Sequence, residues 1–200
     1  MKGASIIGGH SSKNPRVDND YYATDPAAVY RLLNEYPIYS IGMSFLEPCV
    51  GSGHIADAVL DFFGEKIDDV TTLDIVDRGY PGTITQDFLT WETDSRFDCI
   101  ITNPPYSLAR EFVEKCMTLL SDGGCLAMFL KIQFLEGQKR EALFRKYPPK
   151  YIYVFRNRMA TWSNGRCVDP DTGKRWATTF CNAWFVWEKG NRDEPIVRWL

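Results

Sequence analysis

Three patterns that would assign this chain to other classes of protein are missing from its 200 residues. No apolar run approaches the roughly 20 residues that a membrane-spanning helix needs. Residues 1–9 are too short and too interrupted by glycine for a signal peptide. The six cysteines are scattered with no Cys-x-x-Cys pair, and only two histidines are present. The sequence therefore predicts a cytoplasmic protein with reduced cysteines, no membrane span and no metal site.

Two nucleotide-binding signatures are also incomplete. Gly51-Ser-Gly53 begins a Gly-x-Gly-x-x-Gly motif, but Ala56 occupies the place of the third glycine. No lysine followed by serine or threonine completes a phosphate-binding P-loop. A nicotinamide-dependent dehydrogenase is therefore a poor match. Internal repeats and low-complexity segments are absent as well, and the length fits one domain with a substantial core.

The net charge of −3 conceals an uneven distribution along the chain. Residues 1–130 carry a net charge of −10, whereas residues 131–200 carry +7. An acidic front and a basic rear predict that a polyanionic partner docks on the rear part. The alternative is that the basic residues only form a solvated helix face.

The stretch Asp98–Tyr106 is the most informative part of the sequence. A short apolar run ends there in Asn103-Pro104-Pro105-Tyr106. Because proline lacks the N–H that a strand ladder needs, we expect a buried strand to end at Asn103. Ligands of open α/β sheets bind at that edge. The Asn103 carboxamide, the Pro104 carbonyl and the Tyr106 ring suit a planar group bearing an NH2, since they offer two acceptors and a stacking face.

A second informative stretch is Phe-Leu-Glu-Pro-Cys-Val-Gly-Ser-Gly at residues 45–53. It reads as a short strand ending at Glu47, a loop with Gly51 and Gly53, and then a helix. Strand, glycine loop and helix in this order are typical of nucleotide-cofactor sites, because glycine lets the backbone approach the ligand. The carboxylate of Glu47 would repel a pyrophosphate but attract an ammonium group.

Acidic residues end the next two predicted strands. Residues 70–74 end in Asp74, about twenty residues past the glycines, where dinucleotide-type sites hold ribose hydroxyls. Residues 83–88 end in Asp87 and Phe88, an acceptor beside a ring that would suit a purine. A turn or cap role is the alternative for each aspartate, and a core position for Phe88.

The N-terminal part predicts an arm and a helix. Residues 1–20 are polar and without periodicity, which is typical of a flexible arm. Asp25 followed by Pro26 is a strong helix start, and apolar residues follow at helical spacing as far as Tyr36. Two tyrosines directly precede this helix. They either pack or hold part of a charged ligand at the helix N-terminus.

Beyond residue 106 the sequence alternates between helical and strand patterns, as α/β folds do. The segment Asp122-Gly-Gly124 is expected to end the first of these helices. The predicted helices cover 109–120 and 134–147, the second being basic, and the predicted strands cover 125–130, 151–155 and 180–187.

The segment 156–178 is predicted to be a long loop between two strands, and long loops are usually functional. Interleaved basic and aromatic residues suit nucleic acid, through phosphate contacts and base stacking. The candidate contacts are Arg156, Arg158, Trp162, Arg166, Lys174 and Arg175.

Taken together, the motif order resembles the S-adenosylmethionine-dependent N6-adenine DNA methyltransferases. The resemblance extends from about residue 21 to 187 and rests on Tyr-x-x-Asp-Pro, Glu-x-x-x-Gly-x-Gly, two strand-end acids and the tetrapeptide Asn-Pro-Pro-Tyr. The cofactor region precedes the tetrapeptide, as in the gamma arrangement. The resemblance implies a class I, Rossmann-like α/β fold. It would be a three-layer sandwich over residues 21–200, with a mostly parallel seven-stranded sheet and an antiparallel last strand.

The resemblance also implies roles for individual residues, with S-adenosyl-L-methionine as cofactor. Asp74 would hold the ribose hydroxyls, Asp87 and Phe88 would contact the cofactor adenine, and Tyr106 would stack on the target base. The methionine end would be held by Tyr22, Thr24 and Asp25, and the main loop formed by Glu47, Pro48, Gly51 and Gly53. The catalytic set would be Asn103, Pro104, Pro105 and Tyr106, with Asn103 also beside the cofactor.

Several alternatives stay open at this point. The chain has no room for the large target-recognition domain that many such enzymes carry, and short chains of this kind resemble phage-borne methyltransferases. DNA is the expected partner, but an RNA base or a protein glutamine amide also presents a planar NH2 group. A non-catalytic cofactor-binding module is a further alternative. The sequence does not predict an oligomeric state.

Overall fold

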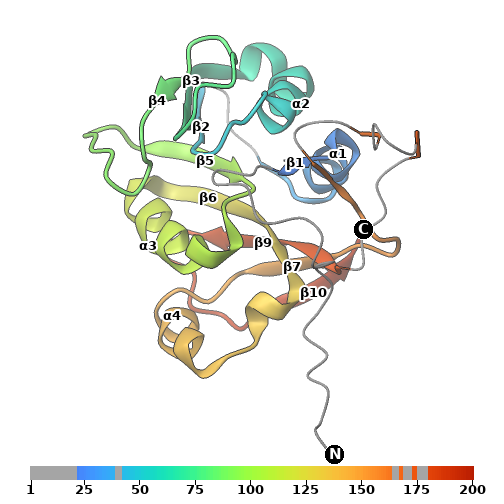
Figure 1. Cartoon of the computed structure of the whole chain (residues 1–200). Coiled ribbons are helices and arrows are strands. Elements are labelled where there is room, and N and C mark those ends of the chain that lie inside the picture. The colour runs from blue at the N-terminus through green and yellow to red at the C-terminus, as the bar shows by residue number, and fades with distance from the viewer. Residues whose placement is uncertain (1–21, 39–41, 164–166, 169–172, 175–179) are drawn as a thin grey trace, which may run out of the picture.

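The computed structural model describes residues 22–38, 42–163, 167–168, 173–174 and 180–200 (Figure 1). Predictions for residues 1–20, Arg166 and Arg175 lie outside this part of the chain. The helices are α1 (Pro26–Glu35), α2 (His54–Phe63), α3 (Ala109–Leu119) and α4 (Glu141–Lys146), with 3-10 turns η1 (Gly64–Lys66), η2 (Tyr106–Leu108), η3 (Ile132–Leu135) and η4 (Gln138–Arg140). The strands are β1 (Tyr22–Thr24), β2 (Met43–Glu47), β3 (Ile67–Asp74), β4 (Ile84–Thr85), β5 (Phe97–Thr102), β6 (Leu120–Lys131), β7 (Tyr151–Val154), β8 (Thr161–Ser163), β9 (Asn182–Glu188) and β10 (Ile196–Trp199).

The main sheet has eight strands in the order β10-β7-β9-β6-β5-β2-β3-β4. All neighbouring pairs are parallel except those that β9 makes with β6 and β7. The mostly parallel sheet and the antiparallel strand near 180–187 are thus confirmed, but the predicted count of seven strands is wrong. The additional strand is β10, whose four residues are all exposed. A strand without a buried face leaves no alternating pattern in the sequence.

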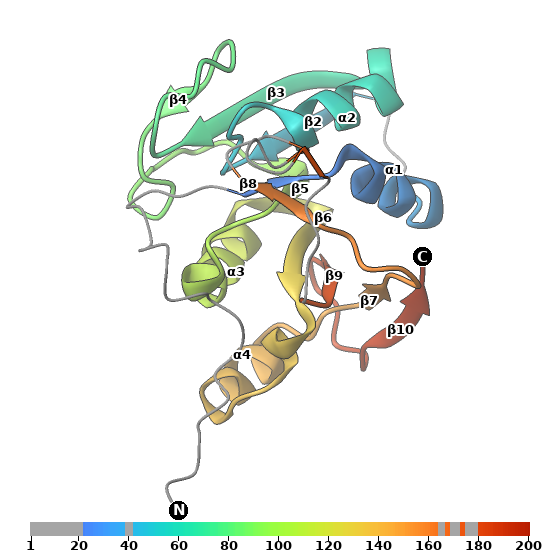
Figure 2. The ribbon, with the colours of Figure 1, turned by 45° about the vertical axis from the view of Figure 1, so that its right-hand side comes forward.

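Helices cover both faces of the sheet and make three layers (Figures 1 and 2). On one face α1 and α2 pack on a core that includes Phe129 and Trp184. On the other face α3 and α4 pack on a core that includes Phe134 and Phe185. Neighbouring residues of β6 and β9 alternate between these two cores. Because both faces are covered, these central strands are apolar almost throughout, as the run over 125–130 predicted.

Helix α1 begins as the sequence predicts. The Asp25 side chain accepts a hydrogen bond from the Ala27 N–H at 2.9 Å, and Pro26 is the first helical residue. Proline is tolerated at this position because the backbone N–H that it lacks would have no helical partner there. The buried side of the helix carries Val29 and Leu32, four and seven residues after the cap. The cap fixes where the chain turns from β1 into α1.

Four predicted elements differ from the structure. The strand over 83–88 is reduced to β4, and the helix over 134–147 is broken into η3, η4 and α4, since Gly137 adopts a φ of +107° between the two 3-10 turns. The segment 122–124 continues β6 instead of ending the preceding helix. The loop over 156–178 contains β8, which pairs with β1 outside the main sheet. Strand pairing decides the other three cases over local propensity.

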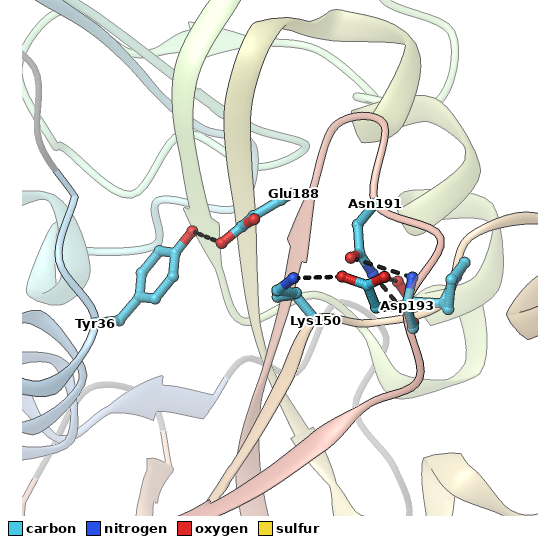
Figure 3. Close-up of polar contacts among 6 residues, drawn as sticks. Tyr36, Lys150, Glu188, Asn191 and Asp193 are labelled. Atoms are coloured by element: carbon cyan, nitrogen blue, oxygen red, sulfur yellow. Dashed lines mark hydrogen bonds and ion pairs between the residues drawn. The ribbon is translucent and has the colours of Figure 1, made fainter.

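Polar contacts hold the β9–β10 end of the sheet together (Figure 3). The Tyr36 hydroxyl donates a hydrogen bond to Glu188 at 3.0 Å. Burial of the tyrosine, together with the nearby Cys125 and Glu188, raises its pKa. The Lys150 ammonium lies 2.8 Å from the Asp193 carboxylate. Asn191 reaches the backbone of Asp193 and closes the turn before β10. These contacts anchor the strand that the sequence did not reveal.

Candidate functional site

The candidate site lies at the carboxyl ends of β2, β3 and β5. Strand β2 has β3 on one side and β5 on its other side. The order of the strands along the sheet therefore reverses between β2 and β5. Open α/β sheets bind ligands at such a switch point. Three polar residues gather there: Glu47 ends β2, Asp74 ends β3 and Asn103 follows β5.

The glycine loop approaches its surroundings closely. Gly51 and Gly53 have φ values of +58° and +91°, which side chains rarely adopt. A Cβ on Gly53 would lie 2.1 Å from the Tyr80 ring. A cavity of about 410 Å³ opens beside this contact and is lined by Ser52, Asp57, Arg78, Gly79, Tyr80 and Pro81. The loop therefore requires glycine for its conformation and for the space.

Asp74 ties the loop to the next strand end. Its Oδ2 accepts a hydrogen bond from the Gly51 N–H at 2.8 Å, and its Oδ1 accepts one from the Val76 N–H at 3.0 Å. The Nε of Arg78 lies 4.0 Å from Oδ1. A carboxylate has about four acceptor positions, so Asp74 retains capacity for a ligand hydroxyl. The predicted ribose contact stays a prediction.

Glu47 is an acid buried beneath the same loop. It is 1 % exposed, and its Oε2 has no hydrogen-bond partner among the described residues. Burial raises its pKa well above the usual range, the Ala56 N–H bond opposes this rise, and Asp74 and Asp57 add to it. A positively charged ligand group would favour the ionised carboxylate. The site is therefore built to gain from an incoming cation.

Asn103 has a defined orientation. Its Nδ2 donates a hydrogen bond of 2.8 Å to the backbone carbonyl of Tyr22 in β1. Because a carbonyl only accepts, the NH2 group must face Tyr22, and Oδ1 is presented as an acceptor on the other side. Pro104 is buried and Pro105 is exposed, so the chain turns sharply outward after the strand.

Tyr106 begins η2 and is half-buried beside the tip of β5. Burial raises the pKa of its hydroxyl, with Tyr22 adding to the effect, so the phenol is neutral at physiological pH. The Lys131 ammonium lies 5.0 Å from the centroid of the Tyr106 ring. Tyr106 follows Asn103 by three residues, and its predicted stacking role stays a prediction.

The β1–β8 ribbon places the segment after β7 at the site. Tyr22 pairs with Ser163, and Thr24 is buried with its hydroxyl unpartnered among the described residues. The Trp162 ring packs edge-on against His54 at 5.3 Å. Burial lowers the pKa of His54, which directly follows the glycine loop. Trp162, predicted to contact nucleic acid, therefore lies on the side of the glycine loop.

The predicted purine pair shows the geometry of the alternative role. Asp87 accepts from the Leu89 N–H at 2.9 Å and so closes a turn. Phe88 is 2 % exposed, and its ring lies 5.0 Å from that of Phe112 in the core. The cofactor-adenine contact stays a prediction for both residues.

Three of the basic candidates, Arg156, Arg158 and Lys174, are exposed. The two arginines come two and four residues after the end of β7 at Val154. The Arg156 N–H donates to the Leu200 carbonyl at 3.0 Å, which joins this segment to the end of β10. Their nucleic-acid role stays a prediction.

Two residues of the site were missed in the sequence. Ile75 directly follows Asp74 and is 58 % exposed, an apolar surface at the ligand edge. The sequence signal for Ile75 is an aliphatic residue directly after Asp74, the acid that ends a predicted strand. Lys131 looked like part of a general basic region, and only the fold places it at Tyr106.

The described residues hold no group of three or more His, Cys, Asp or Glu side chains arranged for a metal ion. None of the helices in this part of the chain is long and apolar enough to cross a membrane.

Comparison with known proteins places the fold. The chain overlays on the type I restriction-modification system methyltransferase subunit from Streptococcus thermophilus with a TM-score of 0.63 and 16 % identity, covering 89 % of this chain and 47 % of that one. It overlays on a predicted O-methyltransferase from Agrobacterium tumefaciens with a TM-score of 0.61 and 16 % identity, covering 88 % and 86 %. This is the class I S-adenosylmethionine-dependent methyltransferase fold.

One similarity is visible in sequence. The type II methyltransferase M.CvrRI from Paramecium bursaria Chlorella virus XZ-6E is 30 % identical over an alignment of 120 residues. The match covers 48 % of this chain and 32 % of the relative, so the chain spans about a third of that protein's length. No family model matches the sequence.

Proposed function

We propose that this protein transfers a methyl group from S-adenosyl-L-methionine to the exocyclic N6 amine of adenine in DNA. The observation that carries the proposal is the Asn103 hydrogen bond to the Tyr22 carbonyl, which presents Oδ1 as an acceptor at the tip of β5. The Pro104 carbonyl follows in the same rigid turn. Two acceptors at this point match the two hydrogens of an aromatic amine.

The residues at the strand ends fit the proposed cofactor. Glu47 is a buried acid with an unpartnered oxygen, which suits an ammonium group, and Thr24 adds a buried hydroxyl. Gly51 and Gly53 let the backbone approach a ligand, and Asp74 borders the same loop. Ile75 offers an apolar face for a purine ring. When bound, S-adenosyl-L-methionine supplies an electrophilic methyl group on a sulfonium.

Asn103 and Pro104 would act on the nucleophile. The lone pair of an exocyclic aromatic amine is delocalised into the ring, so the nitrogen is weakly nucleophilic. Acceptors aimed at its hydrogens favour a more tetrahedral nitrogen and stabilise the positive charge that develops on it. Holding the amine in line with the methyl group supplies much of the rate. This chemistry needs no strong base at the moment of transfer.

Tyr106 would hold the target base. A base inside a duplex must be extruded before it reaches a strand-end site, and a ring at that site replaces part of the lost stacking. Pro105 keeps the turn rigid between the acceptors and the ring. Both features support a flat aromatic amine as substrate.

A nucleic-acid substrate is favoured by the charge distribution and by the names of the relatives. The rear of the chain is basic, with a net charge of +7 over residues 131–200. Two of the similar proteins are, by name, a type II methyltransferase and a subunit of a type I restriction-modification system. These features support nucleic acid over a protein amide.

The test is transfer of a tritiated methyl group from S-adenosyl-L-methionine. The purified protein is incubated in parallel with duplex DNA, structured RNA and protein extract, and labelled nucleosides are separated after digestion. We expect label in N6-methyl-deoxyadenosine. Label that appears only in cytosine, in RNA or in glutamine would refute the proposal.

A further inference from the structure

Lys131 lies at the edge of the sheet that carries the candidate site. It is the last residue of β6, the neighbour of β5 in the sheet. Thr102 lies opposite Met128, so Lys131 extends past the end of β5 on the edge where Asn103 lies. The Lys131 ammonium lies 5.0 Å from the Tyr106 centroid and 3.5 Å from the Phe180 centroid. A cation is thus in contact with the ring proposed to stack on the target base.

The Lys131 ammonium lies over two rings at once. Its distances of 5.0 Å to the Tyr106 centroid and 3.5 Å to the Phe180 centroid are within the range of cation–π contacts. A base that stacks on this face of Tyr106 would take the place of the ammonium, so the ammonium must move aside.

Lysine is suited to that movement. Its ammonium is a compact charge on a flexible four-carbon stem with three donors. Every nucleotide carries a phosphate close to its base, and a lysine is a strong donor to phosphate. A neutral glutamine amide would offer the displaced ammonium no anion. The cation therefore discriminates between the two classes of planar amine that the acceptors alone would admit.

We propose that Lys131 binds the backbone phosphate beside the extruded base, and so makes the site selective for nucleic acid over peptide amides. This inference rests on the proposed function. The resting contacts with Tyr106 and Phe180 hold the cation at the entrance until a nucleotide enters.

The test compares Lys131→Gln with wild type on two versions of a duplex that the wild type methylates. One version is natural, and the other carries a neutral methylphosphonate linkage beside the target base, on each side in turn. On natural DNA we expect kcat/KM to fall roughly 10- to 100-fold, as for a lost charged hydrogen bond. The salt slope of binding should fall by about one. On the duplex with a neutral linkage at the contacted position, the kcat/KM of the wild type should fall to that of Lys131→Gln.

Three controls accompany this comparison. Lys66→Gln removes the same charge from the exposed turn η1, at the opposite edge of the sheet, and should leave kcat/KM unchanged. Lys131→Arg keeps the charge and should retain most of the activity. Unchanged affinity of Lys131→Gln for S-adenosyl-L-methionine would show that its cofactor site is intact.

The outcomes are distinguishable. If Lys131→Gln lowers kcat/KM by the same factor on the neutral linkage as on natural DNA, the two changes act independently. Lys131 then contacts only the two rings, and the phosphate contact is refuted. An unchanged kcat/KM for Lys131→Gln on natural DNA also refutes it. A wild-type protein that labels only protein amides overturns the proposed function itself, before any variant is compared.

Discussion

The substitution Glu47→Gln should separate stability from cofactor binding. Glutamine has nearly the same shape but no charge, and Glu47 is 1 % exposed with an unpartnered Oε2 among the described residues. Burial raises its pKa in the folded protein. An acid whose folded pKa is raised contributes stability below its unfolded pKa, and this contribution is lost as the pH rises through the folded pKa. Glu47 therefore lowers the free energy of unfolding of the wild-type protein at neutral and alkaline pH.

The magnitude follows from the burial of that carboxyl group. Each unit by which burial raises the pKa of a carboxyl group lowers the free energy of unfolding by about 1.4 kcal/mol once the pH is above that pKa. For a chain of this size each kcal/mol changes Tm by about 2–4 °C. We expect Glu47→Gln to raise Tm by a few degrees at pH 8 and to have little effect near pH 4. If Glu47 holds the ammonium of S-adenosyl-L-methionine, the variant should bind it roughly 10- to 150-fold more weakly.

Thermal unfolding across pH measures the first effect, and titration calorimetry with S-adenosyl-L-methionine measures the second. Binding to the wild type should also release a proton, because a cation favours the ionised carboxylate. Asp69→Asn is the matched control, since Asp69 is exposed on β3 away from the ligand edge. Unchanged cofactor affinity in Glu47→Gln would refute the ammonium contact. A lower Tm at pH 8 would refute the charge argument.

Three further predictions concern Asn103, Gly53 and Asp98. Asn103→Ala should lower kcat at least 100-fold while S-adenosyl-L-methionine still binds, because it removes the acceptor for the amine together with the hydrogen bond to the Tyr22 carbonyl. Single-turnover rates and calorimetry check this, and retained turnover rules the acceptor role out. Gly53→Ala should abolish cofactor binding and lower Tm, because the added Cβ would lie 2.1 Å from the Tyr80 ring at a φ of +91°. The control is Gly64→Ala, where φ is +54° but no atom lies within 4 Å of the added Cβ. It measures the cost of the backbone conformation without the clash. Burial opposes ionisation of Asp98, but bonds from Ser121 and Ser44 outweigh it and lower its pKa. Its contribution is therefore present above the unfolded pKa and lost as pH falls, so Asp98→Asn should narrow the Tm difference between pH 7 and pH 3; an unchanged pH profile contradicts this.

Much of the fold follows from local chemistry. Asp25 and Pro26 determine the start of α1, because cap geometry depends on adjacent residues only. Buried central strands are recognisable because both faces must be apolar. Strand β10 and strand β8 were not recognisable in this way. Their pairing partners, β7 and β1, lie more than 40 residues and more than 130 residues away in the chain.

The sequence by itself determined the composition of the candidate site. An acid, two glycines and Asn-Pro-Pro-Tyr stand at strand ends, where parallel strands must bring them to one edge. Only the tertiary structure decided how those groups are oriented and which others join them. The Asn103 amide is aligned by a carbonyl 81 residues earlier in the chain, and Lys131 reaches the Tyr106 ring from a neighbouring strand. Such contacts depend on strand order and register, which local residue patterns do not encode.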